Sequence, residues 1–168
     1  MARRIDYSAT FEHPAETVYA ALGDRGYWEA RMAQMRTFAD NAGSLVSHEV
    51  TADGIDLVIH HVLPRTELPE IAQAVLKSDL IITRTERYTR FGDPVTGTYE
   101  ATIPAAPGSL TGTMELFGTG TGCTLRTTSE AKVSIPFVGG KIEELMLANL
   151  VELFRNEAAI TTAWLAAR

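Results

Sequence analysis

The sequence predicts an α+β fold, in which a curved, seven-stranded antiparallel sheet is covered by one long C-terminal helix. Two observations carry this prediction. Segments with alternating apolar and polar residues follow one another as far as about residue 135, and turn-forming residues separate them. The last segment, about 141–167, contains no Gly or Pro and is rich in Ala, Leu and Glu. As a helix it would be about 40 Å long, which is comparable to the ~34 Å width of seven adjacent strands.

The chain opens with one strand and two short helices. Residues 4–12 alternate apolar and polar side chains, which is typical of a half-buried strand. Pro14 suits the first turn of a helix, and Gly23 marks the end of that helix. A second short helix is expected over about 26–36, and it gathers large apolar side chains on one face: Trp28, Met32 and Met35.

Six more strands and one inserted helix are expected before the long helix. Residues 44–52 and 55–63 flank Asp53-Gly54, a dipeptide that strongly indicates a hairpin. Apolar residues at helical spacing predict a short helix over 69–77. The other strands are expected at about 80–91, 95–104, 109–118 and 122–135. With no linker-like segment in between, we predict a single domain over residues 1–168.

Composition excludes several classes of protein. The chain has 15 Lys and Arg against 21 Asp and Glu, a net charge of −6, which disfavours nucleic-acid binding. Its one cysteine, Cys123, excludes an intramolecular disulfide and a cysteine-rich zinc site. The sequence holds no apolar run of the ~18 residues that span a bilayer and no signal-peptide core. We therefore expect a cytoplasmic protein with no integral membrane association, no bound metal and no cofactor.

The order of elements resembles the START-like superfamily of polyketide cyclases and lipid-transport proteins (SRPBCC), which has the helix-grip fold. The segments that carry the resemblance are IDYSATFEHPAETVYAALGD, RGYWEARM, VSIPFVGGKIEELMLANLVELF and ITTAWL. Within that superfamily they are similar to an uncharacterised bacterial group best known from actinobacteria. The resemblance covers essentially the whole chain but includes no catalytic signature, so it speaks to fold more than to activity. It implies a cavity between sheet and long helix that holds an apolar small molecule.

Glu157 is the most informative residue of the long helix. At about 100° per residue it falls on the same broad face as the apolar side chains, which include Met146, Leu150 and Phe154. A carboxylate on a buried face is costly unless it is paired or neutral, and burial by itself would raise its pKa. Glu157 could bind a ligand or act as a general acid or base. The alternative is a carboxylate at a wet cavity mouth or one paired with an arginine.

His61 shares a strand face with Ile55, Leu57 and Ile59, and it is therefore expected to point inward. A neutral imidazole at that place could donate or accept a hydrogen bond from a ligand. The alternative is a core histidine that is bonded to a backbone carbonyl.

The strand at 80–91 is the most polar one. Arg84, Glu86 and Tyr88 share one face of it with Leu80 and Ile82. If this face lines the cavity, it offers a charged pair and a phenol for anchoring a ligand. If it faces solvent, the same residues form cross-strand ion pairs. The sequence leaves this choice open.

Further candidate ligand contacts are Tyr99, Met114, Met146, Leu150 and Phe154, which could form an adaptable apolar wall or simply pack the core. Three functions remain open at this point. The first is binding of an apolar small molecule (a lipid, polyketide or quinone-like compound) for carriage or sensing. The second is a cyclase, dehydratase or hydrolase that uses Glu157 and His61 as acid and base, with Arg84 or Tyr99 orienting the substrate. The third is a protein-interaction domain, such as a homodimer formed through exposed sheet edges.

Overall fold

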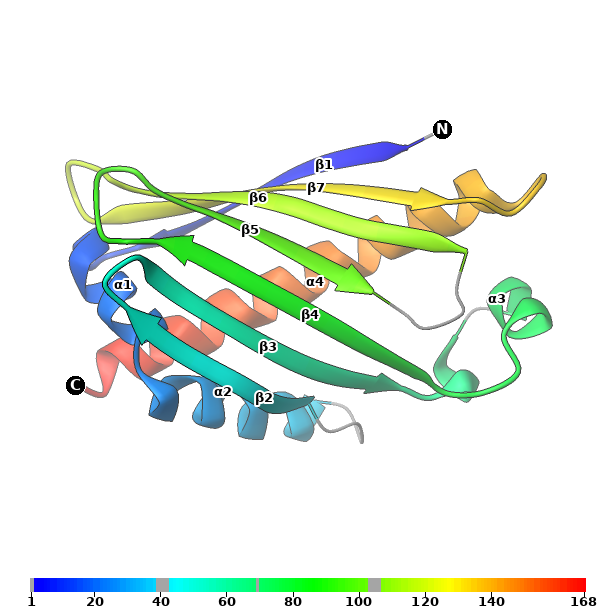
Figure 1. Ribbon diagram of the computed structural model, residues 1–168, viewed down its shortest axis with the longest axis horizontal. Coiled ribbons are helices and arrows are strands. Elements are labelled where there is room, and N and C mark those ends of the chain that lie inside the picture. Colours follow the sequence, from blue (N-terminus) through cyan, green and yellow to red (C-terminus); the bar gives the residue numbers. More distant parts are fainter. Residues whose placement is uncertain (1, 39–42, 69, 103–106) are drawn as a thin grey trace.

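The structure is a computed structural model that describes residues 2–38, 43–68, 70–102 and 107–168 (Figure 1). Its strands form one antiparallel seven-stranded sheet in the order β1-β7-β6-β5-β4-β3-β2. The elements are β1 (Arg3–Phe11), α1 (Ala15–Leu22), α2 (Arg25–Phe38), β2 (Gly43–Thr51), β3 (Gly54–Leu63), η1 (Arg65–Glu67), α3 (Glu70–Val75), β4 (Leu80–Thr89), β5 (Val95–Thr102), β6 (Gly108–Gly118), β7 (Cys123–Val133) and α4 (Gly139–Ala166). The predicted α+β architecture is confirmed.

The helix inserted between β3 and β4 differs from the prediction. It was expected over 69–77, whereas α3 is a six-residue helix that ends at Val75, and a 3-10 turn precedes it. Arg65 explains the early end, because its guanidinium donates to the carbonyl oxygens of Leu76 (2.7 Å) and Gln73 (2.7 Å). Among the predicted boundaries, residue 69 and the last two residues of the strand expected over 95–104 lie outside the described residues.

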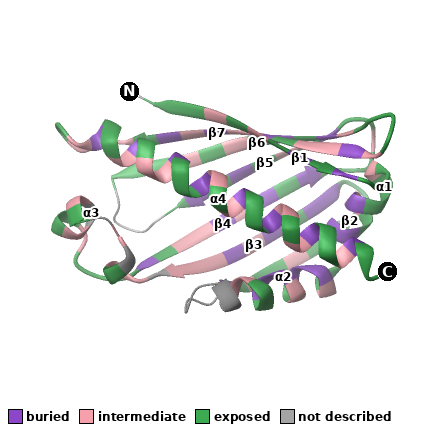
Figure 2. Ribbon diagram, turned by 180° about the vertical axis from the view of Figure 1, so that it is seen from behind, coloured by how far each residue is buried: buried purple, intermediate pink, exposed green. Residues whose placement is uncertain are grey.

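Long helix α4 lies across one face of the sheet, where it contacts β1 and β7 (Figures 1 and 2). Helix α2 runs beside β2 and also contacts α4, so these two helices cover the same face. Helix α3 stands at the opposite end of the molecule from α1 (Figure 2). The other face of the sheet carries none of the described helices and presents alternating exposed side chains such as Thr96, Thr98 and Glu100.

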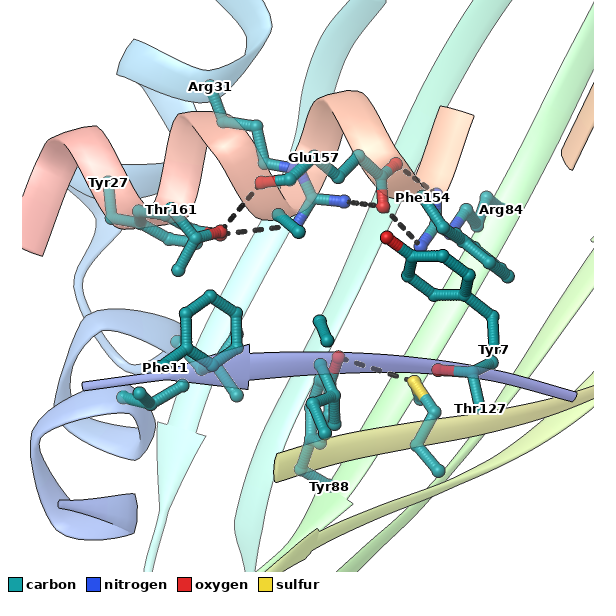
Figure 3. Close-up of a pocket in the computed structure, with 16 residues that line it drawn as sticks. Tyr7, Phe11, Tyr27, Arg31, Arg84, Tyr88, Thr127, Phe154, Glu157 and Thr161 are labelled. Atoms are coloured by element: carbon teal, nitrogen blue, oxygen red, sulfur yellow. Dashed lines mark hydrogen bonds and ion pairs between the residues drawn. The ribbon is translucent and has the colours of Figure 1, made fainter. Parts of the chain in front are cut away.

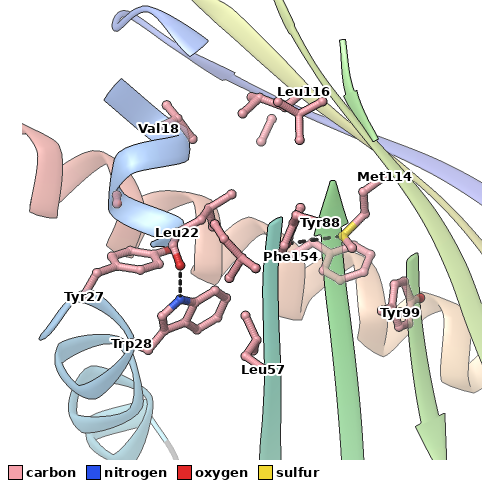
Figure 4. Packing of buried hydrophobic residues seen from close by; sticks show 14 of the residues in the cluster. Val18, Leu22, Tyr27, Trp28, Leu57, Tyr88, Tyr99, Met114, Leu116 and Phe154 are labelled. Atoms are coloured by element: carbon pink, nitrogen blue, oxygen red, sulfur yellow. Dashed lines mark hydrogen bonds between the residues drawn. The ribbon is translucent and has the colours of Figure 1, made fainter. Parts of the chain in front are cut away.

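Trp28 anchors the packing between the helices and the sheet. Its side chain is fully buried, and its indole Nε1 donates to the carbonyl oxygen of Leu22 at 2.8 Å, which ties α2 to the end of α1 (Figure 4). His48 on β2 contacts the same carbonyl oxygen at 3.0 Å. Tyr27 joins α2 to α4 through a 2.6 Å hydrogen bond between its hydroxyl and that of Thr161. None of the described helices is both long and apolar enough to cross a membrane.

Candidate functional site

The polar face of β4 points into the space between the sheet and the helices. In the β3–β4 register Ile59 lies opposite Arg84, and Leu57 lies opposite Glu86. Ile59 and Leu57 are fully buried core residues, so the pleat carries their β4 partners to the same face. Only 6% of Arg84 and none of Glu86 is exposed. The face of β4 that carries Arg84 and Glu86, which the sequence could not orient, therefore points to the interior and not to solvent.

Four buried charged residues form one ion-pair network, which we call the charge cluster: Arg31, Arg84, Glu86 and Glu157. Figure 3 shows Arg31 and Arg84 on either side of the Glu157 carboxylate. Arg84 donates to Glu157 from both terminal nitrogens, from Nη1 to Oε1 at 2.7 Å and from Nη2 to Oε2 at 3.3 Å. Its Nη2 also lies 2.5 Å from Oε1 of Glu86. Arg31 pairs with Glu157 from the other side. The cluster holds two positive and two negative charges, and it joins α2, β4 and α4.

Neighbouring hydroxyl groups add two hydrogen bonds to the cluster. Tyr88 donates to Oε2 of Glu86 at 2.7 Å. The hydroxyl of Tyr27 accepts from Nη1 of Arg31 at 3.3 Å. Such hydrogen bonds are what make buried charges tolerable, because unpaired ones are strongly destabilising.

Arg31 is the member of the cluster that was missing from the sequence analysis. It follows Trp28 by three residues and precedes Met35 by four, so helical spacing puts it on the buried face of α2. A basic residue inside that apolar face, together with an acidic residue inside the apolar face of α4, was the available signal. Opposite charges on two helices that cover the same sheet face favour an ion pair between them.

The pKa of Glu157 contradicts the expectation of a raised value. Burial alone would raise it, but Arg31 and Arg84 outweigh burial and hold the pKa of Glu157 at about 2, below its usual 4.5. Glu157 is therefore the arginine-paired carboxylate that was the alternative in the sequence analysis. It is ionised at neutral pH and has no proton to donate.

A cavity of about 570 Å³ lies beside the charge cluster, between the sheet, α3 and α4. That volume is typical of pockets for small molecules. Aliphatic side chains make most of its wall, among them Ile71 and Val75 of α3, Ile82, Ala101 and Leu110 of the sheet, and Met146, Leu150 and Leu153 of α4. His61, Arg84 and Tyr99 supply polar groups to the same wall.

The predicted site residues divide between this cavity and a smaller one. His61, Arg84, Tyr99, Met146 and Leu150 line the larger cavity. A second pocket of about 50 Å³ is lined by the remaining three, Glu157, Met114 and Phe154, together with Arg84 (Figure 3). The single cavity expected from the sequence is thus two, and Arg84 contributes to both walls.

Aromatic contacts explain the division. The rings of Tyr99 and Phe154 meet edge to face with centroids 6.2 Å apart. The guanidinium of Arg84 lies 5.5 Å from the Tyr99 ring and 5.8 Å from the Phe154 ring. These three side chains fill the space between the two pockets.

His61 lines the larger cavity, as its inward orientation predicted. Burial and the nearby positive charge of Arg84 lower its pKa from 6.5 to about 4, so the ring is neutral at pH 7. Its Nε2 atom is buried and has no hydrogen-bond partner among the described residues. Among those same residues, no three His, Cys, Asp or Glu side chains lie close enough together to hold a metal ion.

His61 should make the protein less stable in mild acid. Because its pKa is lower in the folded chain, the unfolded chain takes up the proton first as the pH falls below 6.5. We expect the free energy of unfolding to fall by about 1–2 kcal/mol between pH 6.5 and 5, above the range in which Glu157 titrates. Urea unfolding at both pH values should show this loss in the wild type and in His13→Gln, but not in His61→Gln. Equal losses in all three would contradict this account.

A further depression of about 580 Å³ lies on the helix-free face of the sheet. It is open to solvent, and most of the residues around it have exposed polar side chains, among them Arg87, Thr98, Thr113, Glu115 and Arg126. An apolar ligand would remain in contact with water there, so this depression is the weaker candidate for an apolar ligand.

The chain has relatives along its whole length. A family model described as "Protein of unknown function (DUF2505)" matches residues 6–165. The uncharacterized protein Rv0481c of Mycobacterium tuberculosis is 31% identical over 172 residues, which cover 98% of this chain and 98% of the relative.

Two solved structures place the fold. The di-domain ARO/CYC StfQ from the steffimycin biosynthetic pathway matches with a TM-score of 0.65 and 14% identity, over 100% of this chain and 52% of that one. Norcoclaurine synthase from Thalictrum flavum matches with a TM-score of 0.57 and 12% identity, over 100% of this chain and 88% of that one. The helix-grip fold is thereby confirmed, while an activity does not follow from a shared fold.

Proposed function

Because the chain belongs to the DUF2505 family, whose function is unknown, its role must be argued from its own site, and we propose that it binds an apolar small molecule in the larger cavity. The ligand class that fits is a lipid, polyketide or quinone-like compound, held for carriage or sensing rather than chemically changed.

The observation that carries the proposal is the cavity itself. A volume of about 570 Å³ bounded mostly by aliphatic side chains costs stability when empty, since the lining atoms lose contacts and apolar surface stays exposed. A bound apolar molecule would recover those contacts. Two proteins of the same fold carry names that refer to small-molecule biosynthesis, a norcoclaurine synthase and a protein of the steffimycin pathway, which supports a small-molecule ligand.

The enzymatic alternative is weakened by the state of its two candidate groups. Glu157 would have to exchange a proton near neutral pH, but its two arginine partners hold its pKa at about 2. Glu157 also lines the smaller pocket, whereas His61 lines the larger one. A protein-interaction role, including a homodimer through the sheet edges at β1 and β2, stays a prediction that the oligomeric state in solution would test.

Filling the cavity should weaken binding. Ala101 is buried on β5 and lines the cavity, so Ala101→Phe would place a ring in the ligand's space. We expect this variant to weaken binding of the neutral fluorescent probe N-phenyl-1-naphthylamine at least about tenfold, equivalent to ~1.4 kcal/mol. Titration of probe fluorescence measures the effect.

The matched control is Thr102→Phe. Thr102 is the next residue of β5, and its side chain is exposed on the helix-free face, so the added ring stays outside the cavity. This variant should bind the probe like the wild type. The proposal fails if the wild type does not bind the probe, or if both variants bind it equally well while their circular dichroism spectra show native folds.

A further inference from the structure

We propose that the larger cavity selects ligands whose polar end is uncharged, a hydroxyl or a carbonyl group, over ligands that end in an ionised carboxylate. This inference rests on the proposed function and names the chemical class of ligand that the same cavity takes.

The first support is the balance of charge at the polar wall. Arg84 is the only charged residue among the described residues that line the cavity. Both of its terminal nitrogens are already engaged by Glu157 and Glu86, and Arg31 supplies the second positive charge that the two carboxylates require. A carboxylate ligand would therefore add a third negative charge beside two cations in a buried place. Removing an ion from water without a free counter-charge is strongly unfavourable.

The second support is the set of hydrogen-bonding groups that remain. Nε of Arg84 and Nε2 of His61 are buried and have no hydrogen-bond partner among the described residues. Both residues line the cavity. If an oxygen of the ligand reaches these atoms, the Arg84 Nε–H can donate to a hydroxyl or carbonyl oxygen, and His61 Nε2 can accept from a hydroxyl in the tautomer that carries its proton on Nδ1. The nearby hydroxyl of Tyr99 already donates to Oγ of Ser129 at 2.6 Å.

These two observations lead to the same ligand chemistry. Arg84 Nε and His61 Nε2 can form one or two hydrogen bonds with a ligand. The charge cluster has no net charge with which to pair an anion. A neutral oxygen at the end of an apolar body satisfies both conditions. An unsubstituted hydrocarbon would leave the two nitrogen atoms without partners, which is also unfavourable.

The test compares dodecan-1-ol, dodecan-2-one and dodecanoate as competitors of N-phenyl-1-naphthylamine at pH 8. Dodecanoate leaves water less readily than the alcohol does, whatever cavity receives it. The decisive quantity is therefore how the ratio of the two affinities changes between variants. We expect the wild type to bind dodecan-1-ol and dodecan-2-one at least about tenfold more tightly than dodecanoate.

The decisive variant is Glu157→Gln, which leaves the cluster with one excess positive charge. It should shift the affinity ratio toward dodecanoate by at least about tenfold. The matched control is Glu152→Gln on the same helix, since Glu152 is exposed and pairs on the surface with Arg155, less than one turn away. Its ratio should equal that of the wild type.

A third variant keeps the inference testable if Glu157→Gln does not fold. His61→Phe removes the imidazole acceptor. It should weaken the binding of dodecan-1-ol by about fivefold relative to the binding of dodecan-2-one. The inference is overturned if wild-type protein binds dodecanoate as tightly as dodecan-1-ol, or if the folded variants leave the ratios unchanged. If no competitor displaces the probe, or the probe itself does not bind, the proposed function fails instead.

Discussion

Replacing Arg84 with methionine is expected to lower the free energy of unfolding by about 3–5 kcal/mol. The change removes a buried cation that pairs with both Glu86 and Glu157. Glu86 is fully buried and would be left with the hydroxyl of Tyr88 as its hydrogen-bond donor. A buried charge without its partner is far costlier than a lost surface pair, because no water replaces the missing contact. Urea unfolding followed by circular dichroism at pH 7.5 measures the loss.

Arg87→Met is the matched control for this prediction. Arg87 lies three residues along the same strand, but on the exposed face, where its Nε is 3.7 Å from Oδ1 of Asp56. Exposed ion pairs of this kind contribute roughly 0–1 kcal/mol, so this variant should unfold almost like the wild type. Similar losses in the two variants would show that the buried cluster does not hold α4 to the sheet.

A double variant separates the effect of charge balance from that of packing. Arg31→Met combined with Glu157→Leu removes one charge of each sign and leaves Arg84 paired with Glu86. It should be less destabilised than Arg31→Met alone, because Arg31→Met alone leaves two buried carboxylates sharing the single positive charge of Arg84, whereas the double variant leaves one charge of each sign. A double variant that loses as much as the two single variants added together would contradict the charge-balance explanation.

Replacing Trp28 with alanine is expected to cost about 3–5 kcal/mol. The indole is fully buried, its Nε1 holds the carbonyl oxygen of Leu22, and Cζ of Arg31 lies 4.6 Å from the ring centroid. The variant therefore loses packing between α1, α2 and the sheet and also the support of one cluster arginine. Thermal and urea unfolding report the loss.

Trp164 provides the comparison, because it is the other of the two tryptophans in the chain. It is half-buried on α4 and meets Tyr27 edge to face with ring centroids 5.8 Å apart. Trp164→Ala should cost about half as much as Trp28→Ala, in proportion to the apolar surface that each side chain buries. If the two variants lose the same stability, Trp28 is not the anchor described above.

Local sequence patterns were enough to predict the fold. Strand alternation, turn residues and a long segment free of Gly and Pro predicted the described strands and α-helices, because each of these signals depends on residues that are close together in the sequence. The 3-10 turn at Arg65–Glu67 was not predicted. The position of helix α3 was predicted correctly, but its predicted length was too great. Its end depends on Arg65, whose contacts with Gln73 and Leu76 come from tertiary structure rather than from helical periodicity.

The candidate site could be predicted only in part. The helical period correctly put Glu157 on the buried face of α4, and strand alternation correctly turned His61 inward. Neither pattern predicts which residues of other helices or strands lie opposite Glu157 or His61. The pairing of Glu157 with Arg31 and Arg84, its low pKa and the division of the cavity all depend on distances between separate elements, which no local pattern contains.

The order of the sheet has a consequence for how the chain is made. Strand β1 is synthesised first, but its hydrogen-bonded neighbour is β7, with Arg3 opposite Ala131 and Phe11 opposite Cys123. Glu157, which neutralises Arg31 and Arg84, is translated later still. While α4 is still inside the ribosome, the nascent chain lacks the Glu157 carboxylate that pairs with Arg31 and Arg84. Until β7 has also emerged, β1 has no neighbouring strand to bind. Since domains fold as units during translation, we expect stable folding only after α4 has left the ribosome, with chaperones protecting the earlier intermediates.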